Sequence, residues 1–204
     1  VLVLLTLPLT PRTAAQLALR DLRDVLARRL DVVADKLGGD QLPTTPDWRE
    51  ALPDVADPMW HARTEVRAMA LADRYNWRTR LFHTGALRYD VAATRRQLEA
   101  LERIAVLVDD LSLTVADRER RDADPEVWPG LGGPARDATI RAVRELARVL
   151  RSDGAGEVDP EALQAADDAA ESLQHSVQSG EGASLSSAGM TVAHSIRRAL
   201  WTIR

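Results

Sequence analysis

The fold is decided by the stretch Leu87-Arg-Tyr-Asp-Val-Ala-Ala-Thr-Arg-Arg-Gln-Leu-Glu-Ala-Leu-Glu-Arg-Ile-Ala-Val-Leu-Val108. Its apolar positions are separated alternately by four and three residues, which places them on one face of an α-helix. They are Leu87, Val91, Thr94, Leu98, Leu101, Ala105 and Val108, and the same face is widened by Ile104, Leu107, Leu111 and Val115. The pattern predicts a helix over residues 87–121, about 50 Å long. We expect this helix to be the spine on which several other helices pack.

Other segments of the chain carry the same helical spacing. A second stripe over residues 11–37 consists of Leu19, Leu22, Leu26, Leu30, Val33 and Leu37. A helix that starts at Asp57 has a buried face of Met59, Ala62, Val66 and Met69. Three shorter helices are predicted near 134–151 (Thr139, Val143, Leu146, Leu150 inward), 159–179 (Leu163, Ala166, Ala170, Leu173, Val177) and 184–203 (Val192, Ile196, Ala199, Ile203).

A threonine or aspartate directly before a proline recurs at the expected helix starts. The side-chain oxygen can accept a hydrogen bond from a first-turn amide, and proline is tolerated at the first helical position. The pairs are Thr10-Pro11, Thr45-Pro46, Asp57-Pro58, Asp124-Pro125 and Asp159-Pro160. No segment shows the alternation of a strand bounded by hairpin turns. The sequence therefore predicts an all-α protein: an antiparallel up-and-down helical bundle of about five to six helices with one long central helix.

Composition limits the classes of function. The chain has 204 residues, 45% of them hydrophobic, which suffices for a folded core. Its net charge of −4 argues against a nucleic-acid-binding protein, and the absence of cysteine excludes disulfides and thiolate metal sites.

The first ten residues, Val1-Leu-Val-Leu-Leu-Thr-Leu-Pro-Leu-Thr10, are strongly apolar. They lack the basic region and the cleavage pattern of a signal peptide, and they are shorter than the roughly 20 residues that span a bilayer. Arginines follow at once, as in the cytoplasmic flank of a membrane helix. We therefore interpret residues 1–10 as the end of a truncated membrane helix and residues 11–204 as a cytosolic helical-bundle domain. The alternative is an amino-terminal arm packed on the core.

No constellation typical of catalysis or metal binding stands out. His61 and Glu65 share a helical face, but no second histidine is placed to complete a zinc site. The carboxylate pairs Asp109-Asp110 and Asp167-Asp168 lie among exposed charges, and no phosphate-binding or nucleophile motif occurs. We therefore expect no enzyme activity, no catalytic residue, no metal and no cofactor.

One cluster is rich in cationic and aromatic groups: Arg74, Trp77, Arg78, Arg80 and His83. An arginine can bind a carboxylate through two hydrogen bonds, and a tryptophan can stack on an aromatic ring. The cluster is therefore a candidate site for a small aromatic acid. The same residues would also suit anionic lipid headgroups or a neighbouring subunit. In the simplest alternative this segment is a helix corner whose aromatic residues pack while its arginines face water.

The chain resembles the cytosolic part of the fusaric-acid-resistance (FUSC), or aromatic-acid-exporter, family of actinobacterial type. The resemblance rests on Leu7-Pro-Leu-Thr-Pro-Arg12 with the helix that follows it, Leu71-Ala-Asp-Arg-Tyr-Asn-Trp-Arg78, and Leu98-Glu-Ala-Leu-Glu-Arg-Ile-Ala105. It implies a domain on the cytoplasmic side of the bacterial inner membrane, attached to membrane-embedded helices of the same protein and assembled as a homo-oligomer. The implied function is export of small aromatic or amphipathic acids, with a structural, assembly or regulatory role for this domain. The alternative function is a stand-alone helical interaction or regulatory module without transport.

Overall fold

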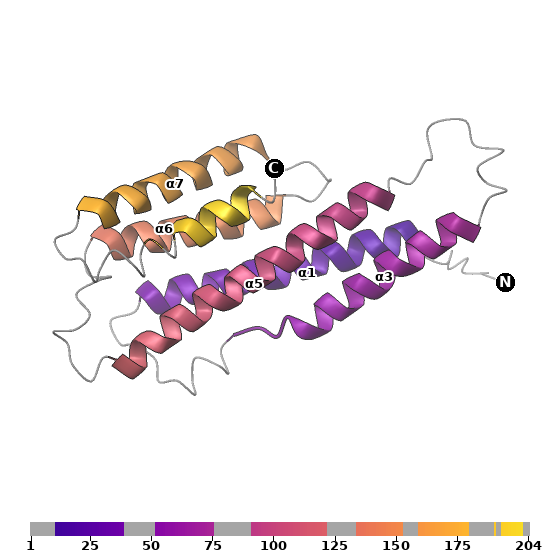
Figure 1. Ribbon diagram of the computed structural model, residues 1–204, viewed down its shortest axis with the longest axis horizontal. Helices are drawn as coiled ribbons and strands as arrows, with labels where there is room; N and C mark the ends of the chain where they lie inside the picture. Colours follow the sequence, from indigo (N-terminus) through magenta and orange to yellow (C-terminus); the bar gives the residue numbers. More distant parts are fainter. Residues whose placement is uncertain are drawn as a thin grey trace, which may run out of the picture.

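A computed structural model describes residues 11–38, 52–75, 91–121, 134–152, 159–179, 190 and 193–201. The long elements are helices: α1 (Pro11–Gly38), α3 (Ala56–Tyr75), α5 (Val91–Arg121), α6 (Pro134–Ser152) and α7 (Pro160–Ser179). A further helical segment covers residues 193–201, drawn yellow in Figure 1. Within these ranges there is no strand, and the prediction of an all-α helical bundle is confirmed.

α1 lies at the centre of the bundle and packs against α3, α5 and α6 (Figure 1). All six residues of its predicted stripe are buried, from Leu19 to Leu37. Small residues widen the buried surface well beyond that stripe: Ala15, Ala18, Ala27 and Ala34. Because alanines let other helices approach closely, α1 can contact neighbours on several sides.

α5 is the long helix that the sequence singled out, but it packs only along one side, on α1 and α3. Leu101, Ile104, Val108 and Leu111 are buried, whereas Leu98 is half-buried. The central position that we expected for residues 87–121 therefore belongs to α1. The reason is the width of the buried surface, since α5 alternates its apolar residues with exposed arginines and carboxylates while α1 does not.

α6, α7 and the segment 193–201 form the other part of the bundle (Figure 1). α6 packs on both α1 and α7, and all four of its predicted inward residues are buried. In α7 the residues predicted to be inward are buried except Leu163, which is half-buried against the core. In the last segment Ile196 and Ala199 are buried as predicted, together with Ala193 and Leu200. Val192 and Ile203 lie outside the described residues.

Two of the five predicted helix starts fall within the described residues. At α7 the prediction is confirmed, because the Asp159 carboxylate accepts a 2.9 Å hydrogen bond from the backbone N–H of Glu161. At α3 the helix begins at Ala56, and the capping carboxylate is that of Asp54, which accepts a 2.9 Å bond from the Ala56 N–H. Asp57 instead lies in the first turn, where a negative charge favours the helix dipole. The pairs at Thr10, Thr45 and Asp124 lie outside the described ranges.

The predicted end of a membrane helix, residues 1–10, also lies outside the described residues. None of the helices in the described ranges combines the length and the apolar character needed to cross a membrane.

Candidate functional site at the basic end of the bundle

Of the predicted ligand-binding cluster, the structure describes only Arg74. It lies in the last turn of α3, where its side chain is exposed, next to Tyr75, which is 74% exposed. Trp77, Arg78, Arg80 and His83 lie outside the described residues, so their convergence with Arg74 stays a prediction. What the structure does define is the surface beside Arg74.

Two ion pairs fix which parts of α1, α3 and α5 lie at the same level. Arg29 of α1 pairs with Asp109 of α5, and Arg63 of α3 donates from Nε to Oε1 of Glu102 of α5 at 2.6 Å. Pro11 and Val91 each lie 18 residues before a member of the first pair. Val91 also lies 11 residues before Glu102, while Tyr75 lies 12 residues after Arg63. The start of α1, the end of α3 and the start of α5 therefore meet at one end of the bundle (Figure 1).

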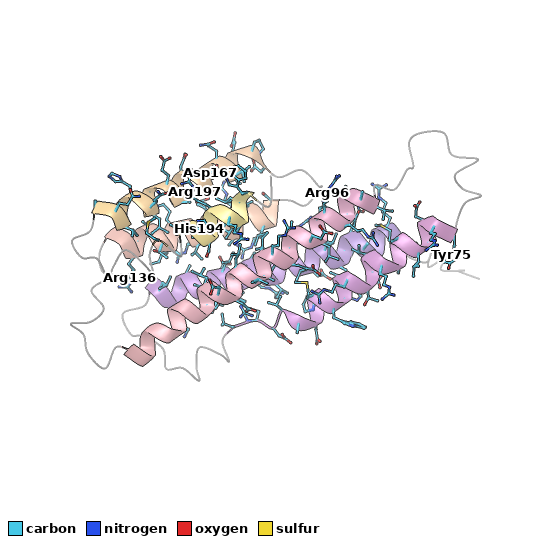
Figure 2. All side chains as sticks on the ribbon, viewed as in Figure 1. Tyr75, Arg96, Arg136, Asp167, His194 and Arg197 are labelled. Atoms are coloured by element: carbon cyan, nitrogen blue, oxygen red, sulfur yellow. The ribbon has the colours of Figure 1, made fainter. Side chains whose placement is uncertain are left out.

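This end of the bundle is strongly basic. We define the basic end as residues 11–20 of α1, 67–75 of α3 and 91–98 of α5. These three segments contain one acidic residue, Asp73, and six exposed arginines: Arg12, Arg20, Arg67, Arg74, Arg95 and Arg96. Figure 2 labels Tyr75 and Arg96 at this end, and Arg136 at the opposite end of the bundle. In a chain whose net charge is −4, such a local excess of positive charge is a feature of the fold.

Arginines at the two ends of the bundle differ in their partners. Far from the basic end, Arg151 of α6 pairs with Asp31, and Arg144 of α6 pairs with Asp35 at 3.0 Å. At the basic end, five of the six arginines form no ion pair or hydrogen bond with any other residue in the described ranges; these are Arg20, Arg67, Arg74, Arg95 and Arg96. Uncompensated like charges repel one another, so an anionic partner would be favoured at this surface.

α3 also exposes large apolar side chains next to these arginines. Trp60 is 67% exposed and Leu71 is 46% exposed, and both lie on the same side of the helix as Tyr75. This side is opposite to the buried Ala62, Val66 and Met69, because the two sets are about half a turn apart at 100° per residue. We call the stripe Trp60, Thr64, Arg67, Leu71, Arg74 and Tyr75 the outer face of α3.

An open groove of about 650 Å³ lies beside the ion pairs, between α1, α5 and the start of α3. Its floor is apolar, with Val55, Met59 and Val106, and four carboxylates outnumber three arginines along its walls. The Arg29 side chain, only 15% exposed, binds Asp109 and the Pro53 carbonyl oxygen. We interpret the groove as a structural clamp that fixes the three helices, since its lining would repel an anion.

Histidine and carboxylate clusters give no further candidate. Among the residues with a described position, no three His, Asp or Glu side chains gather as a metal site would require. His61, which the sequence places near Glu65, is exposed on α3. Comparisons of the chain with protein-family models, with curated proteins and with solved structures found no match.

Sequence reasoning found Arg74 but missed Arg20, Arg67, Arg95 and Arg96 as its neighbours. These arginines are far apart in the sequence, and each looks like an ordinary exposed residue of its own helix. A signal was nevertheless present: in an up-and-down bundle, the start of one helix lies beside the end of the next. Comparing the charges of those ends alone would have shown the basic end.

Proposed function

We propose that the chain is the cytosolic helical domain of an inner-membrane exporter of small aromatic or amphipathic acids, oriented with its basic end toward the membrane. The observation that carries this proposal is that α1 begins at the basic end. The apolar residues 1–10, which we expect to continue a membrane helix, precede Pro11 directly. The expected tether and the arginines would then meet the bilayer together.

Electrostatics supports this orientation. Cytoplasmic segments next to membrane helices carry an excess of arginine and lysine, and the cytoplasmic leaflet has a negative surface potential. The opposite end of the bundle, with Asp31, Asp35, Asp54 and Asp57, would be repelled by the same leaflet. The domain therefore has a preferred orientation, which suits a structural or assembly role beneath a transport bundle. Export itself is inferred from the family resemblance alone.

The direct test uses the natural gene. If the proposal is right, the reading frame upstream of Val1 encodes about six membrane helices, and the whole protein fractionates with the inner membrane. A protease should then reach α1–α7 in inside-out vesicles but not in intact spheroplasts. Cells with the whole gene should release an accumulated aromatic acid faster than cells in which residues 11–204 are deleted. A start codon immediately before Val1, or an unchanged efflux rate after the deletion, would contradict the proposal.

Binding of the aromatic acid by Arg74, Trp77, Arg78, Arg80 and His83 is a separate part of the proposal. Titration of the protein with salicylate should change the tryptophan fluorescence, and Trp77→Ala should abolish that change. A matched control is Trp201→Ala, because Trp201 is exposed at the end of the 193–201 segment. If neither wild type nor control responds, or if Trp77→Ala responds equally, this cluster is not an aromatic-acid site.

One observation favours the alternative of a stand-alone interaction module. Trp60 exposes 67% of its surface in the middle of the bundle, away from any tether. Exposed tryptophan is a frequent anchor of protein interfaces. If the upstream sequence encodes no membrane helices, this alternative becomes the preferred function.

A further inference from the structure

We propose that the basic end, together with the outer face of α3, binds the headgroups of anionic phospholipids directly. This inference deepens the proposed function and rests on it for the orientation of the domain. It adds a ligand, the acidic lipid, and a surface that binds the ligand without any tether.

The outer face of α3 has the pattern of a helix that lies at a membrane interface. From Trp60 to Tyr75 it spans 15 residues, or about 22 Å. Exposed apolar groups alternate along it with arginines that have no partner in the described part of the chain, namely Arg67 and Arg74. The two acidic residues of this stretch, Glu65 and Asp73, are half-buried and lie off the outer face. The face therefore offers positive charge without competing carboxylates.

Each of these groups has a favourable contact in the headgroup region. A guanidinium can donate two hydrogen bonds to one phosphate. Tyrosine and tryptophan favour the interface, where the ring is in an apolar environment and the polar atom stays hydrated. Leu71 and, on α1, the 43% exposed Leu17 can enter the upper acyl region. Arg20 of α1 and Arg95 and Arg96 of α5 extend the positive surface beyond α3.

The layout favours a lipid surface over other anions. The free arginines are spread over three helices, which suits many phosphates side by side rather than one small anion in a pocket. The overall charge of −4 opposes nucleic-acid binding, which gains affinity from a generally basic chain. A bilayer, by contrast, is attracted locally because the Debye length at physiological salt is only about 8 Å. The acidic end of the bundle then contributes little repulsion.

The test is co-sedimentation of the full chain with vesicles of two compositions. One is phosphatidylcholine alone, and the other is phosphatidylcholine with 30% phosphatidylglycerol. We expect binding to the anionic vesicles that is at least tenfold tighter than to the neutral ones, and that weakens steeply as the salt concentration is raised from 50 to 300 mM. Circular dichroism of every variant confirms that helical content is unchanged.

Substitutions locate the binding surface. Arg67→Gln with Arg74→Gln removes two charges from the outer face of α3. At about fivefold per basic residue, affinity for anionic vesicles should fall about 25-fold. The matched control, Arg141→Gln with Arg148→Gln, removes the same charge from exposed positions of α6, away from the basic end. It should change the affinity less than threefold. Every variant retains residues 1–10, so that segment cannot cause the difference.

Each outcome has a definite meaning. Equal loss in both double variants would show that net charge alone drives binding, and would overturn the inference. Equal binding to neutral vesicles, or no binding to anionic ones, would also overturn it, and the latter would leave an acidic protein as the partner of the basic end. The proposed function fails separately, through the upstream reading frame and the efflux assay. Lipid binding by a chain without membrane helices would therefore sustain this inference while removing the exporter.

Discussion

Truncation of Leu26 to alanine should destabilise the bundle strongly, because this residue lies in the middle of the central helix with no exposed surface. The substitution removes three carbon atoms from the core, at about 0.8 kcal/mol each, and leaves a cavity that the surrounding helices cannot fill completely. We expect a loss of about 3–4 kcal/mol in the free energy of unfolding. α1 packs on three other helices, so the whole bundle should unfold at a lower denaturant concentration.

Urea denaturation followed by circular dichroism at 222 nm measures this loss. With a slope of about 2–3 kcal/mol per molar urea, the midpoint should fall by more than about 1 M while the slope stays unchanged. The control is Leu17→Ala on the same helix, which is 43% exposed and should cost less than about 1 kcal/mol. If the two variants lose equal stability, or if only part of the helical signal shifts, α1 is not the centre of one cooperative core.

Three further substitutions test local features of the fold. Asp159→Ala removes the carboxylate that accepts the first-turn amide of α7 and should lower stability by about 1 kcal/mol in the same urea assay. Gly38→Ala should raise the melting temperature by about 1–4 °C, because the added Cβ would lie 3.9 Å from Ile140 Cδ1, an ordinary contact, and alanine loses less backbone entropy than glycine on folding. Asp109→Ala should cost more than Arg29→Met, by about 1 kcal/mol, because it leaves a mostly buried guanidinium without its carboxylate; equal costs would refute the clamp.

The helices could be predicted from the sequence because their signals are local. The Leu19–Leu37 stripe follows from spacing alone, and so does the start of α7 at Asp159-Pro160. Which helix is central could not be predicted in the same way. That depends on residues such as Ala27 and Ala34, whose burial reflects how closely other helices approach. Alanine is equally compatible with an exposed helix surface, so its contribution becomes visible only after packing.

The candidate site could be predicted only in part, because it is assembled from distant segments. Arg74 stood out through its aromatic neighbours in the sequence, whereas Arg20 and Arg96 had no such signal. Their proximity depends on the relative levels of α1, α3 and α5, which the Arg29–Asp109 pair and its counterpart on α3 reveal. The cap of α3 was assigned to Asp57 for a related reason, since an aspartate before a proline is a good cap wherever the helix happens to start.

The most direct test of the central claim, that the basic end faces an anionic membrane, is the depth of single labels on bound protein. The chain has no cysteine, so Ala68→Cys near the basic end and Gln178→Cys at the far end of α7 can each carry one fluorophore. With phosphatidylglycerol vesicles that contain headgroup-quencher lipids, the label at position 68 should be quenched strongly and the label at position 178 hardly at all. Equal quenching at the two positions, or stronger quenching at 178, would contradict the claim.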